Sequence, residues 1–382
     1  MEISQSIKYV GVNDHRIDLF EGQYKVPNGM AYNSYVILDE KIAVLDTVDA
    51  EFGGEWIDKV KRELDGRTPD YLVIHHMEPD HSANIALFKG EFPEAVIVST
   101  AKAFAMMKGF FKNEFEDRRI VVGDGDSLSL GEHTLNFITA PMVHWPEVIM
   151  SYESAEKVLF VADAFGKFGA LDIKDEWVDE ARRYYFGIVG KYGIQVQAVL
   201  KKAAALDIKT ICSLHGPVLK ENIGYYISLY DTWSSYRPEC EGVLIAYASI
   251  YGNTRGAALK LGEILRNKGT RVTLIDLARC DMAVAVAEAF KHSTLVLASS
   301  TYNAEVFPPM REFLANLTER SFQKRKVALI ENGSWAPMAA KVMRQALEKS
   351  KEITFADTIV TIRSAVNEDT ERALLSLADE IA

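Results

Sequence analysis

The chain has 382 residues, of which 48% are apolar, 25% charged and 10% aromatic. These proportions are typical of folded globular protein, and at roughly 150 residues per domain the length predicts two to three domains. Because 54 acidic side chains outnumber 43 basic ones, the net charge of −11 argues against nucleic acid as the main partner.

The chain lacks the sequence features of a secreted or membrane protein. No run approaches the eighteen or so apolar residues of a membrane span, and residues 1–10 lack the apolar part of a signal peptide. We therefore expect a cytoplasmic protein with no membrane segment. Cys212, Cys240 and Cys280 lie far apart, which excludes a disulfide framework and a thiolate metal site. Any metal must be held by histidine and carboxylate.

The first 235 residues combine short strands with helices. Apolar residues at three- and four-residue intervals predict a helix from about Glu176 to Leu206. Short β-rich runs separated by polar turns predict buried strands. These runs comprise two within residues 31–48, then Tyr71–Ile74, Ala95–Ser99, Leu135–Ile138 and Val158–Val161.

A polar segment with a proline, Ser234–Gly242, predicts a linker between two domains. Beyond it, β-rich runs alternate with helical patterns such as Arg255–Lys268 and Met338–Lys349. This alternation predicts a five-stranded parallel sheet of the doubly wound α/β class. Its strands are expected at Val243–Tyr247, Arg271–Ile275, Thr294–Leu297, Lys326–Ile330 and Thr358–Val360.

A dense cluster of metal-ligating side chains follows the apolar run Tyr71–Ile74, where residues 75–81 read HHMEPDH. Three more candidates, His144, Asp163 and His215, lie at similar strand ends. Any one of them alone is more often a capped or solvated side chain than a ligand. Together, the four loops can converge on one edge of the fold.

The spacing of these residues resembles the metallo-β-lactamase fold, whose hydrolases usually carry His-x-His-x-Asp-His. Residues 76–81 read His-x-Glu-x-Asp-His, and Glu78 in place of the second histidine is the mark of the flavodiiron proteins, also called A-type flavoproteins. Imidazole suits zinc, whereas anionic oxygen stabilises iron that cycles between ferrous and ferric. The resemblance implies an αββα sandwich with a diiron centre.

The same resemblance implies a role for each ligand. His76, Glu78 and His144 would bind the first iron, Asp80, His81 and His215 the second, and Asp163 would bridge them, so that Glu78 and Asp163 stand at the centre of catalysis. His75 competes with His76, but only His76 has the family spacing to Glu78, so His75 is expected to be structural. We expect His15, His133 and His292 at the surface.

A second site is predicted after the run Val243–Tyr247, where residues 248–256 read ASIYGNTRG and lead into a helix. Hydroxyls, an amide and helix N–H groups in such a turn can hold a phosphate, although serine and threonine can also simply cap the helix. Residues 299–304 and 331–336 follow the third and fourth strands. All three loops therefore lie at the carboxyl edge, where doubly wound sheets bind ligands.

These three loops resemble those of flavodoxin, in which the first binds the phosphate of FMN and the other two flank its ring. Neither a dinucleotide-binding G-x-G-x-x-G after a strand nor a P-loop competes with this interpretation. The implied FMN contacts are Ser249, Ile250, Tyr251, Gly252, Asn253 and Thr254 in the first loop, Thr301, Tyr302, Asn303 and Ala304 in the second, and Asn332, Gly333, Ser334 and Trp335 in the third.

Both resemblances lead to one family, with residues 1–240 as the metallo-β-lactamase-like diiron domain and 243–382 as the flavodoxin-like domain. Flavodiiron proteins reduce dioxygen to water, nitric oxide to nitrous oxide, or both, while FMN relays electrons. No cysteine-rich rubredoxin segment is present, so a separate donor such as rubredoxin or a flavin reductase is expected. The family also implies a head-to-tail homodimer, possibly assembled into a tetramer.

Two other functions are weighed against this one. A zinc hydrolase with a flavodoxin-like appendage is opposed by Glu78 and by the complete set of flavin loops. A non-enzymatic electron carrier with a degraded metal site is opposed by the presence of all seven ligand types. The sequence does not choose between dioxygen and nitric oxide, since both are small, neutral and apolar.

Overall fold

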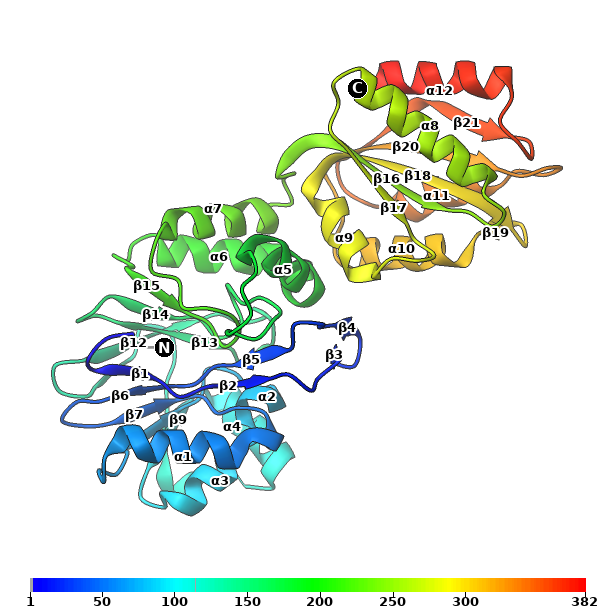
Figure 1. Cartoon of the computed structure of the whole chain (residues 1–382). Coiled ribbons are helices and arrows are strands. Elements are labelled where there is room, and N and C mark those ends of the chain that lie inside the picture. Colours follow the sequence, from blue (N-terminus) through cyan, green and yellow to red (C-terminus); the bar gives the residue numbers. More distant parts are fainter. Residues whose placement is uncertain (1–2, 114) are drawn as a thin grey trace. The chain divides into compact units, whose positions relative to one another are not determined.

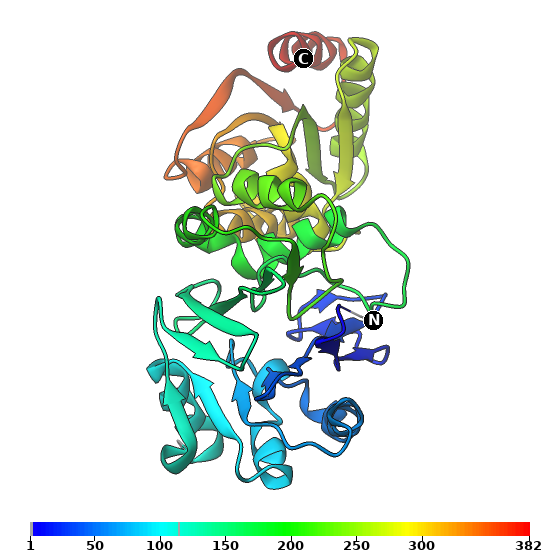
Figure 2. The ribbon, with the colours of Figure 1, turned by 90° about the vertical axis from the view of Figure 1, so that its left-hand side faces the viewer.

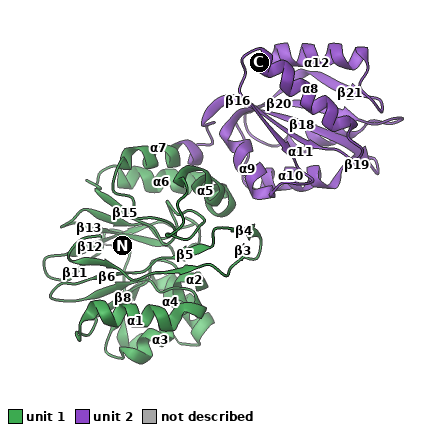
Figure 3. Ribbon diagram, in the orientation of Figure 1, with its two compact units in different colours: residues 1–231 green, residues 232–382 purple. Residues whose placement is uncertain are grey.

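The computed structural model describes residues 3–113 and 115–382, shown from two sides in Figure 1 and Figure 2. The chain divides into two compact units, residues 1–231 and 232–382 (Figure 3). The division falls inside helix α7 (Ile223–Ser234), and residues 235–239 connect that helix to the first strand of the second unit.

Unit 1 contains two facing β-sheets. The first has the strand order β1-β6-β7-β8-β9-β10, and the second runs β11-β12-β13-β14-β15. The first sheet comprises β1 (Ile7–Tyr9), β6 (Tyr35–Ile37), β7 (Ala43–Leu45), β8 (Tyr71–Val73), β9 (Val96–Ser99) and β10 (Arg119–Val121). The second comprises β11 (Ser127–Ser129), β12 (Thr134–Thr139), β13 (Ile149–Glu153), β14 (Val158–Phe160) and β15 (Thr210–Cys212).

One apolar core lies between these sheets. Leu45 and Val73 of the first sheet and Phe137 and Phe160 of the second belong to the same buried cluster. Strands such as β6 and β7 are buried at every residue because helices cover the outer faces. Figure 1 shows α1, α3 and α4 over the first sheet and α5, α6 and α7 over the second. The αββα sandwich is therefore confirmed.

Short elements complete unit 1. Two-stranded ribbons pair β2 (Val12–Asp14) with β5 (Met30–Tyr32) and β3 (Leu19–Phe20) with β4 (Tyr24–Lys25). The helices are α1 (Gly53–Leu64), α2 (Pro79–Ser82), α3 (Ile85–Glu91), α4 (Ala101–Phe111), α5 (Trp177–Tyr184) and α6 (Gly193–Ala203), with 3-10 turns at Ala50–Phe52 and Glu116–Arg118.

The prediction of one helix from Glu176 to Leu206 is wrong in its middle. Between α5 and α6 the backbone forms a π-helical turn, Tyr185–Val189, and a 3-10 turn, Gly190–Tyr192. The Tyr24 hydroxyl donates a hydrogen bond to the Gly187 carbonyl at 2.9 Å, and a Cβ on Gly187 would lie 3.0 Å from the Tyr24 ring. The irregular turns therefore coincide with a contact between distant segments of the chain, which the periodicity of the sequence does not indicate.

Unit 2 is a doubly wound sheet with the strand order β17-β16-β18-β20-β21, all pairs parallel. The short β19 (Glu305–Val306) adds an antiparallel pair with β18. The predicted five-stranded parallel sheet is confirmed. Its strands are β16 (Cys240–Ala248), β17 (Val272–Asp276), β18 (His292–Tyr302), β20 (Arg325–Asn332) and β21 (Ile353–Ile362).

Helices cover both faces of this sheet. Side chains of α8 (Asn253–Asn267) and α12 (Glu368–Ile381) share one buried cluster with the strands. The remaining helices are α9 (Met282–Lys291), α10 (Pro308–Glu319) and α11 (Ala339–Leu347). In the described part of the chain, none of the helices has both the length and the apolar character that crossing a membrane requires.

Candidate functional site

Four strand ends of unit 1 supply the predicted metal ligands. Residues 74–78 leave β8 and enter α2, which begins at Pro79, so that Asp80 and His81 lie in the first turn of a short helix. His144 follows β12, Asp163 follows β14 and His215 follows β15. These three strands run in the same direction, so their carboxyl ends share one edge of the sheet.

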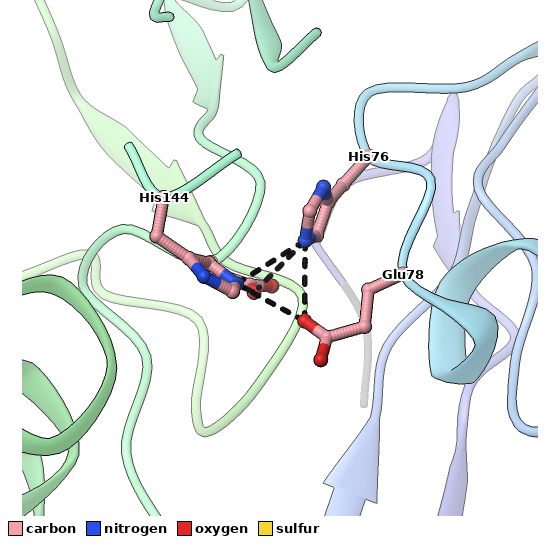
Figure 4. A group of neighbouring side chains, drawn as sticks. His76, Glu78 and His144 are labelled. Carbon is pink, nitrogen blue, oxygen red and sulfur yellow. Dashed lines mark hydrogen bonds and ion pairs between the residues drawn. The ribbon is translucent and has the colours of Figure 1, made fainter. Parts of the chain in front are cut away.

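The first group consists of His76, Glu78 and His144 (Figure 4). Asp163 lies beside these three residues. The Nε2 atoms of His76 and His144 are 3.3 Å apart. Glu78 Oε2 lies 3.2 Å from the former and 3.0 Å from the latter. Three donor atoms from two separate loops therefore point at a common centre.

The second group consists of Asp80, His81 and His215. The Nε2 atoms of the two histidines are 3.0 Å apart. Asp80 Oδ2 is 3.3 Å from His81 Nε2 and 3.2 Å from His215 Nε2. All three residues are buried, so these polar atoms are removed from bulk water.

Asp163 lies between the two groups and turns one oxygen toward each. Its Oδ2 is 3.2 Å from His144 Nε2, and its Oδ1 is 3.2 Å from His81 Nε2. The side chain is almost completely buried. A carboxylate in this orientation can join two metal positions through its separate oxygens.

The donor set fits two metal ions. With metal–ligand bonds of about 2.1 Å, neighbouring ligand atoms are roughly 3.0–3.4 Å apart in octahedral or tetrahedral coordination, which matches the separations given above. Both Asp80 oxygens and Asp163 Oδ1 are buried without a hydrogen-bond partner among the described residues. Asp80 Oδ2 and Asp163 Oδ1 approach histidine Nε2 atoms without forming hydrogen bonds. Since a buried carboxylate oxygen that lacks a hydrogen bond is costly, a cation explains these atoms better than the protein alone does.

Hydrogen bonds behind two histidines set their orientation. His76 Nδ1 lies 2.8 Å from Glu147 Oε1, and His215 Nδ1 lies 2.7 Å from the Ala31 carbonyl oxygen. An acceptor at Nδ1 favours the tautomer that donates from Nδ1 and leaves the Nε2 lone pair facing the centre. The Glu147 oxygen also accepts from the Met77 N–H at 2.9 Å.

In unit 2, the three loops predicted to bind a flavin line a single cavity of about 440 Å³. The predicted contacts that line it are Ser249, Ile250, Tyr251, Asn253, Thr254, Thr301, Asn303, Ala304, Asn332, Gly333, Ser334 and Trp335. Ser300, Ala336, Met338 and Ser364 also line it and were not among the predicted contacts.

Gly252 and Tyr302 do not line this cavity. Gly252 instead precedes α8 with a φ of 95°, a left-handed conformation that suits glycine, and its N–H donates to Ser249 Oγ at 3.1 Å. The Tyr302 ring packs edge-on against Phe307, at 5.8 Å between centroids.

The cavity has the features that FMN requires. The N-terminus of α8 presents free backbone N–H groups beside Thr254, whose Oγ1 is 2.9 Å from Ser300 Oγ, a suitable environment for a phosphate. Trp335 is 90% exposed and Tyr251 94% exposed. Uncovered aromatic rings beside a cavity of this size can stack on a planar ring system.

Comparison with known proteins agrees with both the candidate metal site of unit 1 and the cavity of unit 2. Residues 30–216 match the family model described as ODP family beta lactamase, and residues 245–375 match the flavodoxin model. A nitric oxide reductase of Moorella thermoacetica is 30% identical over 94% of this chain and 92% of its own length. The chain belongs to the flavodiiron family.

Solved structures of this family have the same fold. The rubredoxin oxygen:oxidoreductase of Desulfovibrio gigas superposes with a TM-score of 0.91 at 25% identity, covering 100% of this chain and 97% of its own. The flavodiiron protein of Giardia intestinalis also gives 0.91 at 25% identity, covering 99% and 95%. Family membership implies FMN and a non-haem diiron centre as cofactors.

Charge pairing dominates the electrostatics of the flavodiiron site. Burial would raise the pKa of Glu78, but hydrogen bonds with His144 and His76 outweigh it and hold that pKa well below its usual range. Burial would lower the pKa of His144, but the Asp163 and Glu78 carboxylates raise it to about 9. The anionic carboxylates thus favour a positive charge at the centre, which bound metal ions can supply in place of protons.

His75 lies apart from both groups of candidate ligands. Its Nδ1 pairs with Asp46 Oδ2 at 2.5 Å, and its Nε2 lies 2.8 Å from Ser151 Oγ. Asp46 Oδ1 also accepts from the N–H groups of His75 and His76, at 2.7 Å and 3.4 Å. The network of His75 and Asp46 therefore holds the start of the ligand loop.

Two of the histidines predicted at the surface are buried, so that prediction is wrong for His133 and His292. His133 Nδ1 lies 3.1 Å from the buried Glu153 Oε1. His292 Nε2 lies 3.1 Å from Thr273 Oγ1, and its Nδ1 is 2.9 Å from the Glu288 carbonyl oxygen. A close carboxylate offsets the burial of His133, and hydrogen bonds offset that of His292, whereas His15 remains half exposed.

Sequence reasoning missed Glu147, Tyr184 and Glu21. The Tyr184 hydroxyl is buried without a hydrogen-bond partner in the described structure, and burial followed by the nearby carboxylates, Asp163 first, raises its pKa. Burial and then the Glu78 carboxylate raise the pKa of Glu21 to about 7. Of these three residues, only Glu147 stands in a recognisable sequence context, because it is an acidic residue directly before the apolar run 148–150.

Proposed function

We propose that this chain reduces nitric oxide to nitrous oxide, dioxygen to water, or both, and that FMN relays the electrons. One observation carries the proposal: two buried groups of histidine and carboxylate donors, joined by Asp163, include Glu78 where the related hydrolases have a histidine. When bound, two iron ions supply redox-active positions for the gas, and FMN supplies electrons singly.

The side chains hold and balance this centre. Glu78, Asp80 and Asp163 contribute three negative charges, which favour the higher oxidation state of iron. Glu147 keeps the His76 ring in place through Nδ1. Each histidine in the two groups then directs Nε2 inward.

Both reductions consume protons, and two residues can hold protons beside the centre. Glu21 lies next to Glu78, and burial followed by that carboxylate raises the pKa of Glu21, which favours its protonated form. Tyr184 keeps its phenol proton because burial and the surrounding carboxylates oppose ionisation. We propose these groups as proton-holding residues for the reduction.

The activities for which two relatives are named support both gases. The Moorella thermoacetica relative is named a nitric oxide reductase, and the Desulfovibrio gigas structure is named a rubredoxin oxygen:oxidoreductase. The second name also supports a rubredoxin-type donor for this chain, with a flavin reductase as the alternative. Supplying reduced rubredoxin or a reduced flavin reductase to the purified protein and comparing the rates tests the donor.

Metal and flavin analysis followed by anaerobic assays with each gas tests the function. We expect two irons and one FMN per chain and consumption of at least one gas when an artificial reductant is supplied. Zinc with hydrolysis of a thioester or phosphodiester would instead support the hydrolase. Flavin without metal would support the electron carrier.

We further propose residues 1–240 and 243–382 as the functional domains, and a head-to-tail homodimer, possibly part of a tetramer, as the active form. Sedimentation measurements combined with assays over a dilution series test the assembly. Full activity of a monomer would contradict it.

A further inference from the structure

A second cavity, of about 330 Å³, belongs to unit 1 and lies between its second sheet and the helices α6 and α7. Figure 1 shows these two helices over β14 and β15. Strand alternation explains the apolar wall on the sheet side. Ile149, Phe160 and Cys212 face the core between the sheets, and their neighbours Met150, Leu159 and Ile211 line the cavity.

The inner end of this cavity adjoins the metal ligands. Val143 directly precedes His144, and Ala164 and Phe165 directly follow Asp163. All three lining residues are buried. The loops that carry His144 and Asp163 therefore also form the end wall of the cavity.

The outer end reaches the surface at Ala204, Asp207 and Gly224, which are exposed. Asp207 is the one charged residue among the described residues that line the cavity. Inside, the Tyr230 hydroxyl accepts from the Phe165 N–H at 2.5 Å, and the two rings stack at 4.0 Å. Because that hydroxyl is already paired, the interior offers little to water and is suited to an apolar molecule.

We propose that this cavity binds small apolar gas molecules and holds them beside the metal centre, an inference that rests on the proposed function. Dry apolar cavities of roughly 150 Å³ bind xenon or benzene, so this cavity has room for several diatomic molecules. Nitric oxide and dioxygen are uncharged and weakly hydrated. Their transfer from water into an apolar cavity is therefore favourable in free energy, whereas the transfer of ions and of larger polar reductants is not.

Xenon pressurisation of crystals of the full chain, with iron and FMN bound, tests the binding without any variant. We expect xenon between α6 and the second sheet, near Ala164. Absence of xenon there, or a co-purified acyl chain that fills the space, would overturn the proposal.

Filling the cavity from α6 tests its role in turnover. Val199 and Ala203 line the cavity four residues apart on that helix, whereas Ala198 is exposed and lies outside it. We expect Ala203→Phe and Val199→Phe to raise the KM for the gas by roughly threefold or more with kcat at saturating gas unchanged, because access and not chemistry is altered. Ala198→Phe is the matched control and should behave as wild type.

An unchanged KM in both filled variants, with xenon displaced and iron content normal, would overturn the role of the cavity. Since two positions are used, one misfolded variant does not remove the test. Wild-type protein that reduces neither gas would instead overturn the proposed function. The wild type alone gives that result, so it is distinguishable from a failure of the cavity proposal.

Discussion

The two candidate cofactor sites differ in how the protein builds them. In unit 1, the ligands of both groups are buried or nearly so, contact one another, and are oriented by groups such as Glu147 behind them. In unit 2, hydroxyls and backbone N–H groups line an open cavity beside the exposed rings of Trp335 and Tyr251. We therefore expect metal binding to depend on a few side chains and FMN binding to be spread over many weaker contacts.

Removing the shared carboxylate should give the largest effect and test that contrast most severely. We expect Asp163→Ala to lose most of the iron and nearly all reductase activity, because both groups lose a ligand and a buried negative charge disappears. Iron analysis and gas consumption measure this effect. FMN content should stay normal, since unit 2 is untouched.

The control for this change is Asp172→Ala, which removes an exposed carboxylate farther along the same loop. It should retain both irons. Normal iron content in Asp163→Ala would show that Asp163 is not a shared ligand.

A change at the phosphate end of the flavin cavity should act on the other unit alone. Thr254→Val preserves the shape but removes a hydroxyl, and a lost hydrogen bond to a charged group costs about 1.5–3 kcal/mol. We expect FMN to bind roughly 10–100-fold more weakly with unchanged iron content. Fluorescence titration of the flavin-free protein measures the affinity, with the exposed Thr318→Val as control. Equal affinity in both variants would contradict a phosphate at this turn.

The orientation of His76 should matter less than the ligands themselves. Glu147→Gln keeps an acceptor for Nδ1 but removes the charge, so we expect iron affinity to fall by roughly tenfold. Competition with a chelator measures this affinity. The exposed Glu94→Gln should bind iron as wild type does. If both variants bind equally, Glu147 serves only the fold.

Trp335→Ala should give the smallest effect, because this ring is 90% exposed. Loss of an aromatic stacking contact of about 0.5–1.5 kcal/mol predicts FMN binding roughly 2–10-fold weaker. The same fluorescence titration applies. A much larger loss would show that binding at the flavin site also rests on one dominant side chain.

The parallel sheet of unit 2 was predictable because each buried strand is a short apolar run between longer helical patterns. Parts of unit 1 were not. Strand β13 carries Ser151 and Glu153 at buried positions, so it lacks a clear apolar pattern. Strand β15 has three residues, too few for any periodicity.

The candidate ligands could be found because their spacing follows strand ends along the chain. Glu147 could not be assigned a partner, because that partner, His76, lies 71 positions earlier. Tyr184 was absorbed into a predicted helix, and only the fold brings its hydroxyl near Asp163. Side chains that support the ligands depend on tertiary contacts that a single sequence does not contain.

Asp46 holds the segment before His76 in place without any metal ion. This single carboxylate bonds to two successive backbone N–H groups and to the His75 ring, all through protein atoms. The chain that leads into His76 is therefore held in position even after a chelator strips the centre. Reloading with ferrous ions should then be fast and should need no refolding, since little ordering remains to be done when the ions return.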